Sequence, residues 1–350
     1  MDEEETIRVD RGNDERRCGP YELVRELGRG AMGTVWEARH AALGRRVALK
    51  VIHGEFMKNP ELLARFYREG KAAARLEHPH VAQVFDVGQD EHRAWIVMEL
   101  LEGEDLKTVL DREERLDVTR AVDLFLPVLA GVGAAHAANV THRDLKPANL
   151  FLARDRMGAV MPKVVDFGLS KIRADESGEE MDLTRPDTAL GTLYYMPVEQ
   201  VLASRDAGPA SDQYALGVSL YRCVTGKLPY EGRNNARTFA AITKGVCPRP
   251  SELVPTIPVA LDGVILRAMH REVAGRFPSL QAFGAALLPF ASPAAQARWA
   301  ATFGVNAVSV TAATDRPPRG RLSALQWLAI VVGTLVVIAA GALAVWLAMR

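Results

Sequence analysis

The sequence is poor in cysteine, carries no excess of either charge and begins without an apolar segment. Its three cysteines, Cys18, Cys223 and Cys247, are far apart, which excludes a disulfide scaffold and any CxxC metal or redox site. Lysine plus arginine number 43 and aspartate plus glutamate also 43, so the basic excess of a general nucleic-acid binder is missing. Acidic residues follow Met1, the wrong charge for a secretory or transit peptide. We therefore expect a protein body in a reducing cytosol, with no nucleic-acid partner.

The residue pattern divides the chain into regions. Hydrophobic residues are 48% of the 350, enough for a large core. Residues 1–19 are expected to be a flexible charged tail. Residues 20–100 alternate as strands do, with one helical stretch at 61–76, whereas residues 101–290 have mostly helical spacing. The expected helices of this second region are 119–138, 212–225, 259–269 and 280–290.

Residues 322–349 form a run of 28 residues without a charge. The core of this run, residues 327–349, would be about 34 Å long as a helix, enough to cross a hydrocarbon layer about 30 Å thick. Trp327 and Trp346 lie near its two ends. Three arginines precede it: Arg316, Arg319 and Arg321. The sequence predicts a single C-terminal transmembrane helix in an inner or plasma membrane, with the protein body cytoplasmic and the C-terminus outside.

A buried C-terminal helix of the globular domain is the alternative for this run. It is disfavoured because a soluble core helix of this length rarely lacks a charged face. Ala340, Ala344 and Ala348 form a stripe of small residues through which two such helices could pack as a homodimer. Residues 291–321, rich in alanine, proline and arginine, are expected to be a juxtamembrane linker.

A glycine-rich segment lies early in the strand-like region. Residues 27–35 contain the pattern GxGxxGxV. In a dinucleotide-binding fold a helix follows such glycines. Here a strand-like run at 34–38 follows, then a turn at Gly44 and another strand. The residues predict a β-hairpin with glycines at its tip, where bare backbone can approach phosphates, or else an ordinary glycine-rich hairpin without a ligand.

Four further motifs follow in order. Lys50 ends a Val-Ala-Leu-Lys strand, Glu69 lies on the next helix, residues 142–149 read His-Arg-Asp-Leu-Lys-Pro-Ala-Asn, and residues 166–168 read Asp-Phe-Gly. Over about residues 20–290 the sequence thereby resembles the eukaryotic-type (Hanks-type) serine/threonine protein kinases, in their bacterial version. The resemblance implies an α+β fold of two lobes, a strand-rich N-lobe at 20–100 and a helical C-lobe at 101–290.

The resemblance also implies a role for each polar residue in phosphoryl transfer from ATP. Lys50 would contact the α- and β-phosphates and be held by an ion pair with Glu69. Asn149 and Asp166 would bind Mg²⁺, or Mn²⁺, because hard cations prefer oxygen ligands. Asp144 would orient the substrate hydroxyl and accept its proton.

Lys146, two residues after this base, matches the serine/threonine subgroup of the family. By the same resemblance, Met98 would be the gatekeeper of the adenine pocket, and the backbone of residues 99–101 would be the hinge that binds the base. The full set of residues expected to bind the nucleotide is Leu27, Gly28, Arg29, Gly30, Ala31, Met32, Gly33, Thr34, Val35, Ala48, Lys50, Glu69, Met98, Glu99, Leu101, Phe151 and Asp166.

Arg143, directly before the base, implies control by phosphorylation of the segment 166–199, since an arginine there can pair with a phosphothreonine. The hydroxyl residues considered in this segment are Ser170, Ser177, Thr184, Thr188 and Thr192. Thr184 and Thr188 are the expected autophosphorylation sites, with Ser177 as runner-up. Thr192 matches a family threonine that contacts the catalytic loop.

One departure from the family pattern stands at the end of this segment, where Pro197-Val198-Glu199 replaces Ala-Pro-Glu. Glu199 is still expected to pair with Arg276, and Asp212 to anchor the backbone of the catalytic loop. His78 and His80 are expected to be turn residues rather than metal ligands.

Two functions follow from these motifs. The first is an active membrane-anchored serine/threonine kinase acting on proteins and on itself. The second is a pseudokinase that binds ATP and partner proteins without turnover. The first is favoured because Lys50, Asp144 and Asp166 are all present.

Overall fold

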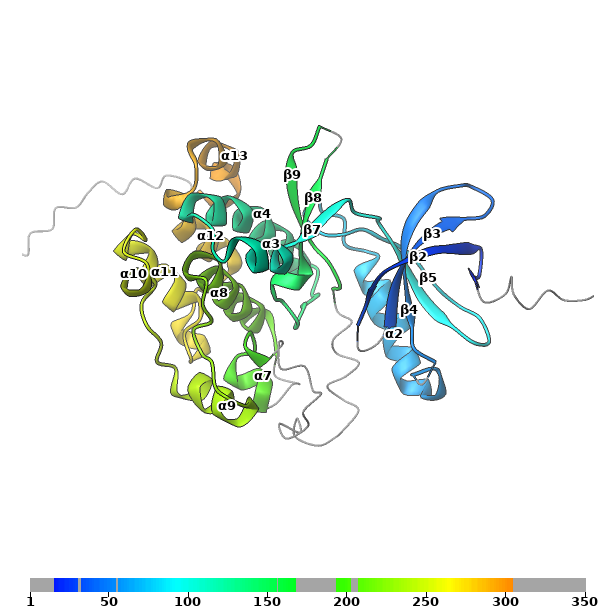
Figure 1. The fold of residues 1–350 in the computed structure, drawn as a ribbon, viewed down its shortest axis with the longest axis horizontal. Coiled ribbons are helices and arrows are strands. Elements are labelled where there is room, and N and C mark those ends of the chain that lie inside the picture. Colours follow the sequence, from blue (N-terminus) through cyan, green and yellow to red (C-terminus); the bar gives the residue numbers. More distant parts are fainter. Residues whose placement is uncertain are drawn as a thin grey trace, which may run out of the picture. The chain divides into compact units, whose positions relative to one another are not determined.

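The computed structural model describes residues 16–304, apart from residues 31–32, 55, 156, 168–192 and 203–206 (Figure 1). Residues 1–15 of the expected tail, the expected transmembrane helix at 322–349 and every candidate phosphorylation site lie outside this range.

The N-terminal lobe is built on a six-stranded sheet in the order β1-β2-β3-β4-β6-β5, in which all neighbours are antiparallel. Its strands are β1 Arg17–Cys18, β2 Tyr21–Arg29, β3 Gly33–His40, β4 Arg46–Ile52, β5 Val84–Gln89 and β6 Ala94–Met98. The 3₁₀ helix η1 (Phe56–Lys58) and the helix α2 (Pro60–Ala73) lie between β4 and β5. Asn59 caps α2 by accepting from the N–H groups of Glu61 and Leu62.

Successive residues of the central strands face opposite sides of this sheet, as the period of two requires. Ala48 and Ile52 of β4 pack in the cluster that contains Phe66 of α2. Val47 and Leu49 pack in a second cluster on the other face. The sheet therefore has two hydrophobic layers, and only one of them includes the helix.

The second cluster corrects the expected tail at 1–19. Cys18 is fully buried there, and β1 pairs with β2 through Cys18 and Tyr21. Gly19 makes the turn between them at φ +54°, a conformation that favours glycine. The many charged residues of this region predicted a mobile tail. Cys18 is nevertheless buried in the second cluster, and β1 forms the edge strand of the sheet.

The C-terminal lobe is mostly helical, with a small sheet in the order β7-β8-β9. The helices are α3 Leu106–Glu113, α4 Val118–Ala137, α7 Val198–Leu202, α8 Pro209–Thr225, α9 Asn235–Lys244, α10 Pro250–Leu253, α11 Val259–Ala268, α12 Leu280–Leu287 and α13 Pro293–Phe303. The strands are β7 Gly103–Asp105, β8 Leu150–Arg154 and β9 Val160–Val164; the 3₁₀ helices are η2 Pro147–Asn149, η4 Val273–Gly275 and η5 Leu288–Phe290. The two-lobed fold expected from the sequence is thus confirmed.

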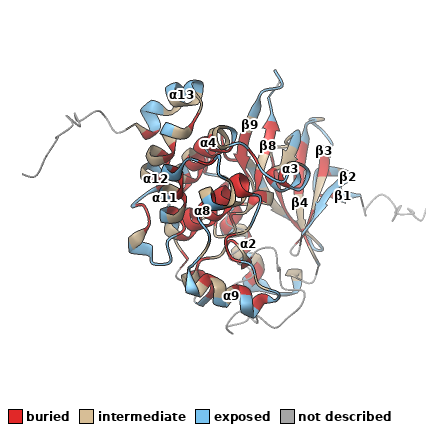
Figure 2. Cartoon of the chain, turned by 60° about the vertical axis from the view of Figure 1, so that its left-hand side comes forward, coloured by how far each residue is buried: buried red, intermediate tan, exposed pale blue. Residues whose placement is uncertain are grey.

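Buried residues follow α4 and α8 through the centre of this lobe (Figure 2). Within the described ranges, α4 is the one helix long and apolar enough to cross a membrane. Its Phe125, Leu126 and Leu129 are at most 1% exposed inside the lobe, as in the core helix of a folded domain.

The helix α13 corrects the expected linker at 291–321, because residues 293–303 are helical and packed. Ser292 caps the helix, and its own N–H donates to Asp123 of α4 at 2.9 Å. Phe303, 3% exposed, lies against Gly284 of α12. The alanine and proline content predicted a linker. The N-cap at Ser292 and the buried Phe303 instead stabilise a packed helix.

Gly284→Ala should destabilise the protein. A Cβ at residue 284 would lie 2.3 Å from the Phe303 ring, which is buried and cannot easily move. We expect a loss of about 1–3 kcal/mol in the free energy of unfolding, measured with urea. The control is Gly263→Ala in α11, where nothing lies within 4 Å of the new methyl group and no loss is expected. Equal effects of the two substitutions would contradict the packing of α13 on α12.

Candidate active site

The glycine-rich segment forms the hairpin between β2 and β3, as the sequence predicts. Gly28 pairs with Val35, and the N–H of Gly30 donates to the carbonyl of Gly33 at 2.9 Å. A Cβ at Gly33 would lie 2.3 Å from the carbonyl oxygen of Val51, so only glycine fits there. A strand follows the glycines, which excludes the dinucleotide-binding arrangement. Ala31 and Met32 lie outside the described residues.

Lys50 projects from β4 and contacts Asp166, which follows β9. Its Nζ lies 2.9 Å from Oδ1 of Asp166, and the two side chains are 12% and 31% exposed. Burial opposes the charge of Asp166, but the nearby Lys50 ammonium outweighs it and holds the pKa of Asp166 below its usual value. Asp166 has φ +63°, a strained conformation for a non-glycine residue.

The ion pair expected between Lys50 and Glu69 is not formed in the described part of the chain, and this prediction was wrong for this structure. Glu69 does lie on α2 and is 7% exposed, so the helix and its buried face are as expected. Sequence spacing placed Glu69 on a helix, but it could not set the distance between that helix and β4.

The segment after β6 joins the two lobes. Ala48 pairs with Met98 across the sheet, and the N–H of Glu99 donates to the carbonyl of Gln83 at 2.9 Å. The Glu99 carboxylate pairs with Lys163 Nζ of β9 at 2.8 Å, a partner that the sequence analysis missed. This pairing leaves the backbone of the hinge, rather than the Glu99 carboxylate, to bind a base.

The loop at 142–149 brings together three polar groups. Lys146 Nζ lies 2.9 and 3.1 Å from the two carboxylate oxygens of Asp144. Asn149 Nδ2 donates to the backbone carbonyl of Asp144 at 2.7 Å. The three residues predicted from the motif therefore converge, with Asp144 about one quarter exposed.

Asp212 of α8 accepts hydrogen bonds from the backbone of this loop, as predicted. Its carboxylate, 1% exposed, accepts from the backbone N–H of His142 at 2.9 Å and of Arg143 at 2.7 Å. His136 Nε2, on α4, lies 2.7 Å from the same carboxylate. Arg143 has φ +67°, so the carboxylate stabilises a backbone conformation that is otherwise strained.

The donor atoms fit a hard divalent cation. Asn149 uses its amide nitrogen toward Asp144, which leaves its amide oxygen available beside the catalytic loop. Asp166 presents one oxygen to Lys50 and retains a second. No group of three histidine, cysteine or acidic residues that could hold a metal occurs among the described residues. One carboxylate and one amide are typical of Mg²⁺ sites completed by phosphate oxygens and water.

The other predicted nucleotide contacts lie on the strands around this site. Ala48 is buried on β4, Val35 and Phe151 are half-buried on β3 and β8, and Leu27 of β2 is 40% exposed. His80, expected in a turn, is buried and lies 2.8 Å from the carbonyl of Pro162 through Nδ1.

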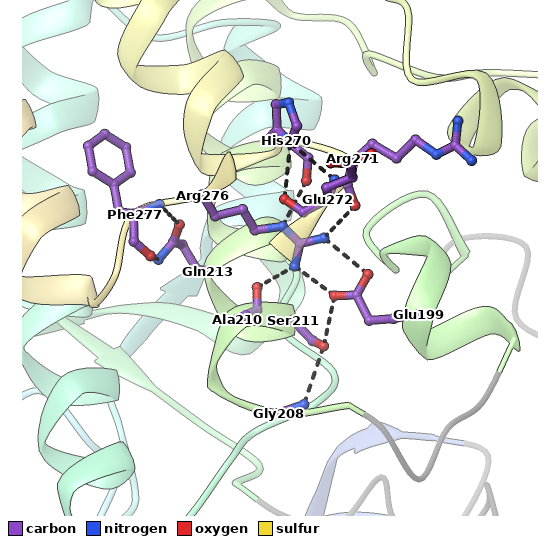
Figure 3. A network of polar contacts seen from close by, with 10 residues as sticks. All are labelled: Glu199, Gly208, Ala210, Ser211, Gln213, His270, Arg271, Glu272, Arg276 and Phe277. Atoms are coloured by element: carbon purple, nitrogen blue, oxygen red, sulfur yellow. Dashed lines mark hydrogen bonds and ion pairs between the residues drawn. The ribbon is translucent and has the colours of Figure 1, made fainter. Parts of the chain in front are cut away.

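The predicted pair of Glu199 and Arg276 is present (Figure 3). The guanidinium lies 2.6 and 3.0 Å from the two carboxylate oxygens and also donates to the carbonyls of Ala210 and His270. The Pro197 carbonyl accepts from Gln200 and thereby begins α7. The Pro197-Val198 departure therefore leaves the ion pair intact.

A glycine hairpin, a lysine on the next strand and an Asp-Lys-Asn loop beside a second aspartate are the features that the sequence resemblance implies for a two-lobed protein kinase domain. Residues 21–263 match the family model of the protein kinase domain. The chain belongs to the protein kinase family.

Relatives and a solved structure agree with this assignment. The chain is 37% identical to serine/threonine-protein kinase Pkn1 of Myxococcus xanthus over 271 residues, 77% of this chain and 38% of that protein. It is 39% identical to serine/threonine-protein kinase PknE of Mycobacterium tuberculosis over 259 residues, 74% of this chain and 44% of that protein. The crystal structure of the M. tuberculosis PknI kinase domain superposes with a TM-score of 0.60 at 27% identity, covering 78% of this chain and 97% of that domain. The chain thus spans less than half the length of these two relatives.

Proposed function

We propose that this chain is an ATP-dependent serine/threonine protein kinase that transfers the γ-phosphate to hydroxyl groups of proteins. The observation that carries the proposal is the convergence of Asp144, Lys146 and Asn149 in one loop, beside the pair of Lys50 and Asp166. The relatives named as serine/threonine kinases support the acceptor class.

The roles of the side chains follow from their contacts. Asp144 accepts the proton of the substrate hydroxyl, and the Lys146 ammonium beside it neutralises charge near the transferred group. Lys50 is positioned on a rigid strand to contact ATP phosphates. The glycine hairpin supplies backbone without side chains where those phosphates approach.

The family uses ATP with a divalent metal, and we propose Mg²⁺, with Mn²⁺ as a substitute. Asn149 and Asp166 would hold it. When bound, such an ion neutralises the phosphate oxygens and orients them for in-line transfer. The oxygen-only donor set of these two residues supports this choice.

We also propose that the kinase is anchored in an inner or plasma membrane through residues 322–349, with the kinase domain cytoplasmic and the C-terminus outside. The length of the uncharged run supports this location. Confinement to a membrane raises the effective concentration of a second copy, which favours autophosphorylation in trans at Thr184 or Thr188 by a homodimer. Arg143 supports this regulation because a guanidinium directly before the proposed base can donate hydrogen bonds to a phosphothreonine of the segment 166–199.

The test is phosphate transfer from γ-labelled ATP to the chain itself and to a generic basic protein, with the full chain in detergent or lipid nanodiscs. We expect label with Mg²⁺ and with Mn²⁺, none after chelation, and phosphopeptides that contain Thr184 or Thr188. Tight, metal-dependent ATP binding without any label would contradict the proposal and favour the pseudokinase.

A further inference from the structure

Gln200 of α7 follows Glu199 in the sequence and is 8% exposed. It contacts the catalytic loop at 142–149. Its Nε2 donates to the backbone carbonyl of Arg143 at 2.6 Å. This carbonyl belongs to the same planar peptide group as the N–H of Asp144. A hydrogen bond to it therefore orients the backbone directly before the proposed base.

This peptide group is held at both of its polar ends. The Asp144 N–H donates to Nδ1 of His142 at 3.3 Å, while its carbonyl end receives the Gln200 amide. The preceding N–H, of Arg143, donates to Asp212 at 2.7 Å. A non-glycine residue with φ +67° keeps that conformation only where its neighbours impose it. Asp212 restrains the N–H side of Arg143, and Gln200 restrains its carbonyl side.

The position of Gln200 is itself fixed from the other side. Its own N–H donates to the Pro197 carbonyl at 3.0 Å, and its neighbour Glu199 is held by the buried Arg276. Gln200 thus connects the end of the segment 166–199 to the catalytic loop through a single amide.

We propose that Gln200 is a positioning residue that sets the orientation of Asp144 through the Arg143 carbonyl. The geometry of the base then depends on the placement of α7. This inference rests on the proposed kinase function for its effect on rate, but the contact itself can be tested without catalysis.

The experiment compares Gln200→Met and Gln200→Glu with the wild type in the full chain. Methionine keeps the length of the side chain and removes the donor. Ionised glutamate cannot donate, whereas protonated glutamate donates through its O–H. The matched control is Gln296→Met in α13, whose Nε2 donates to the carbonyl of Ala291 at 2.9 Å, outside the catalytic loop.

For Gln200→Met we expect kcat for a basic protein substrate to fall about 10- to 100-fold, since small misplacements of a reacting group have effects of this size. The KM for ATP should stay within about twofold, because the hydrogen bonds of Gln200 go to Arg143 and Pro197, neither of which is proposed to bind ATP. Gln296→Met should leave kcat unchanged.

The pH profile separates positioning from a general loss of structure. Burial beside the Arg143 carbonyl raises the pKa of a glutamate at residue 200, because burial and the carbonyl both disfavour the ionised form. Protonation then restores a donor as the pH falls, so the Gln200→Glu rate relative to wild type should rise from pH 8 to pH 6. The relative rate of Gln200→Met should stay flat over the same range.

Amide hydrogen–deuterium exchange over residues 142–149 gives a readout independent of activity. We expect faster exchange there in Gln200→Met and no change in Gln296→Met. If the wild type transferred no phosphate while exchange still rose, the kinase function would fail and the restraint by Gln200 would stand. A kcat within twofold of wild type in Gln200→Met, or unchanged exchange at 142–149, would overturn the inference.

Discussion

Asp144→Asn is expected to lower kcat for phosphate transfer by about 10²–10⁴-fold, the range typical of a lost general base. The amide has the size of the carboxylate but cannot accept the hydroxyl proton, and it no longer neutralises Lys146 at 2.9 Å. Transfer of γ-labelled phosphate to a basic protein, at saturating ATP and Mg²⁺, measures the effect.

ATP binding should survive this substitution. Lys50 and Asp166 are paired with each other rather than with Asp144, so the affinity for ATP should change by less than about twofold. Glu91→Gln, an exposed carboxylate in the turn before β6, removes a charge away from the site and should leave kcat unchanged. More than a tenth of the wild-type rate in Asp144→Asn would show that another group accepts the proton.

Arg276→Leu is expected to cost about 3–5 kcal/mol of the free energy of unfolding. The Arg276 side chain is fully buried and donates to Glu199 and to the carbonyls of Ala210, His270 and Arg271. Leucine has no donor, so the Glu199 carboxylate and the three carbonyls lose their hydrogen bonds from the guanidinium. Urea denaturation of the full chain, followed by circular dichroism, measures the loss.

The matched control is Arg237→Leu on α9, where the arginine is exposed and a change below about 0.5 kcal/mol is expected. The double variant Glu199→Leu with Arg276→Leu should lose less than the sum of the two single losses, because the unpaired charge is gone. Additive losses would show that the ion pair contributes nothing of its own.

The sequence predicts those parts of the site in which the interacting residues are close together in the chain. The loop at 142–149 has Asp144, Lys146 and Asn149 within six residues, so a short backbone path brings them together whatever surrounds it. The glycine hairpin is equally local, since a strand pattern on both sides of the glycines excludes a helix. The strand-like pattern of residues 20–100 also predicted strands at Arg46–Ile52 and Ala94–Met98, where β4 and β6 lie.

Contacts between distant elements were predictable only where a family pattern supplied the partner. Asp212 below the catalytic loop and Arg276 at Glu199 were expected on that ground and are present. The pair of Lys50 with Glu69 was expected in the same way and is replaced by Lys50 with Asp166. The distance between α2 and β4 is set by the packing of the lobe, and residue types at a given spacing do not encode it.

The sequence by itself therefore determined the class of chemistry, because phosphoryl transfer needs these residue types at short, fixed spacings. Tertiary structure alone decided the partners of Glu99 and Arg143. Lys163 and Gln200 reach them across 64 and 57 positions. The physical reason is that a hydrogen bond depends on tenths of an ångström, and only the packed lobes bring such distant residues that close.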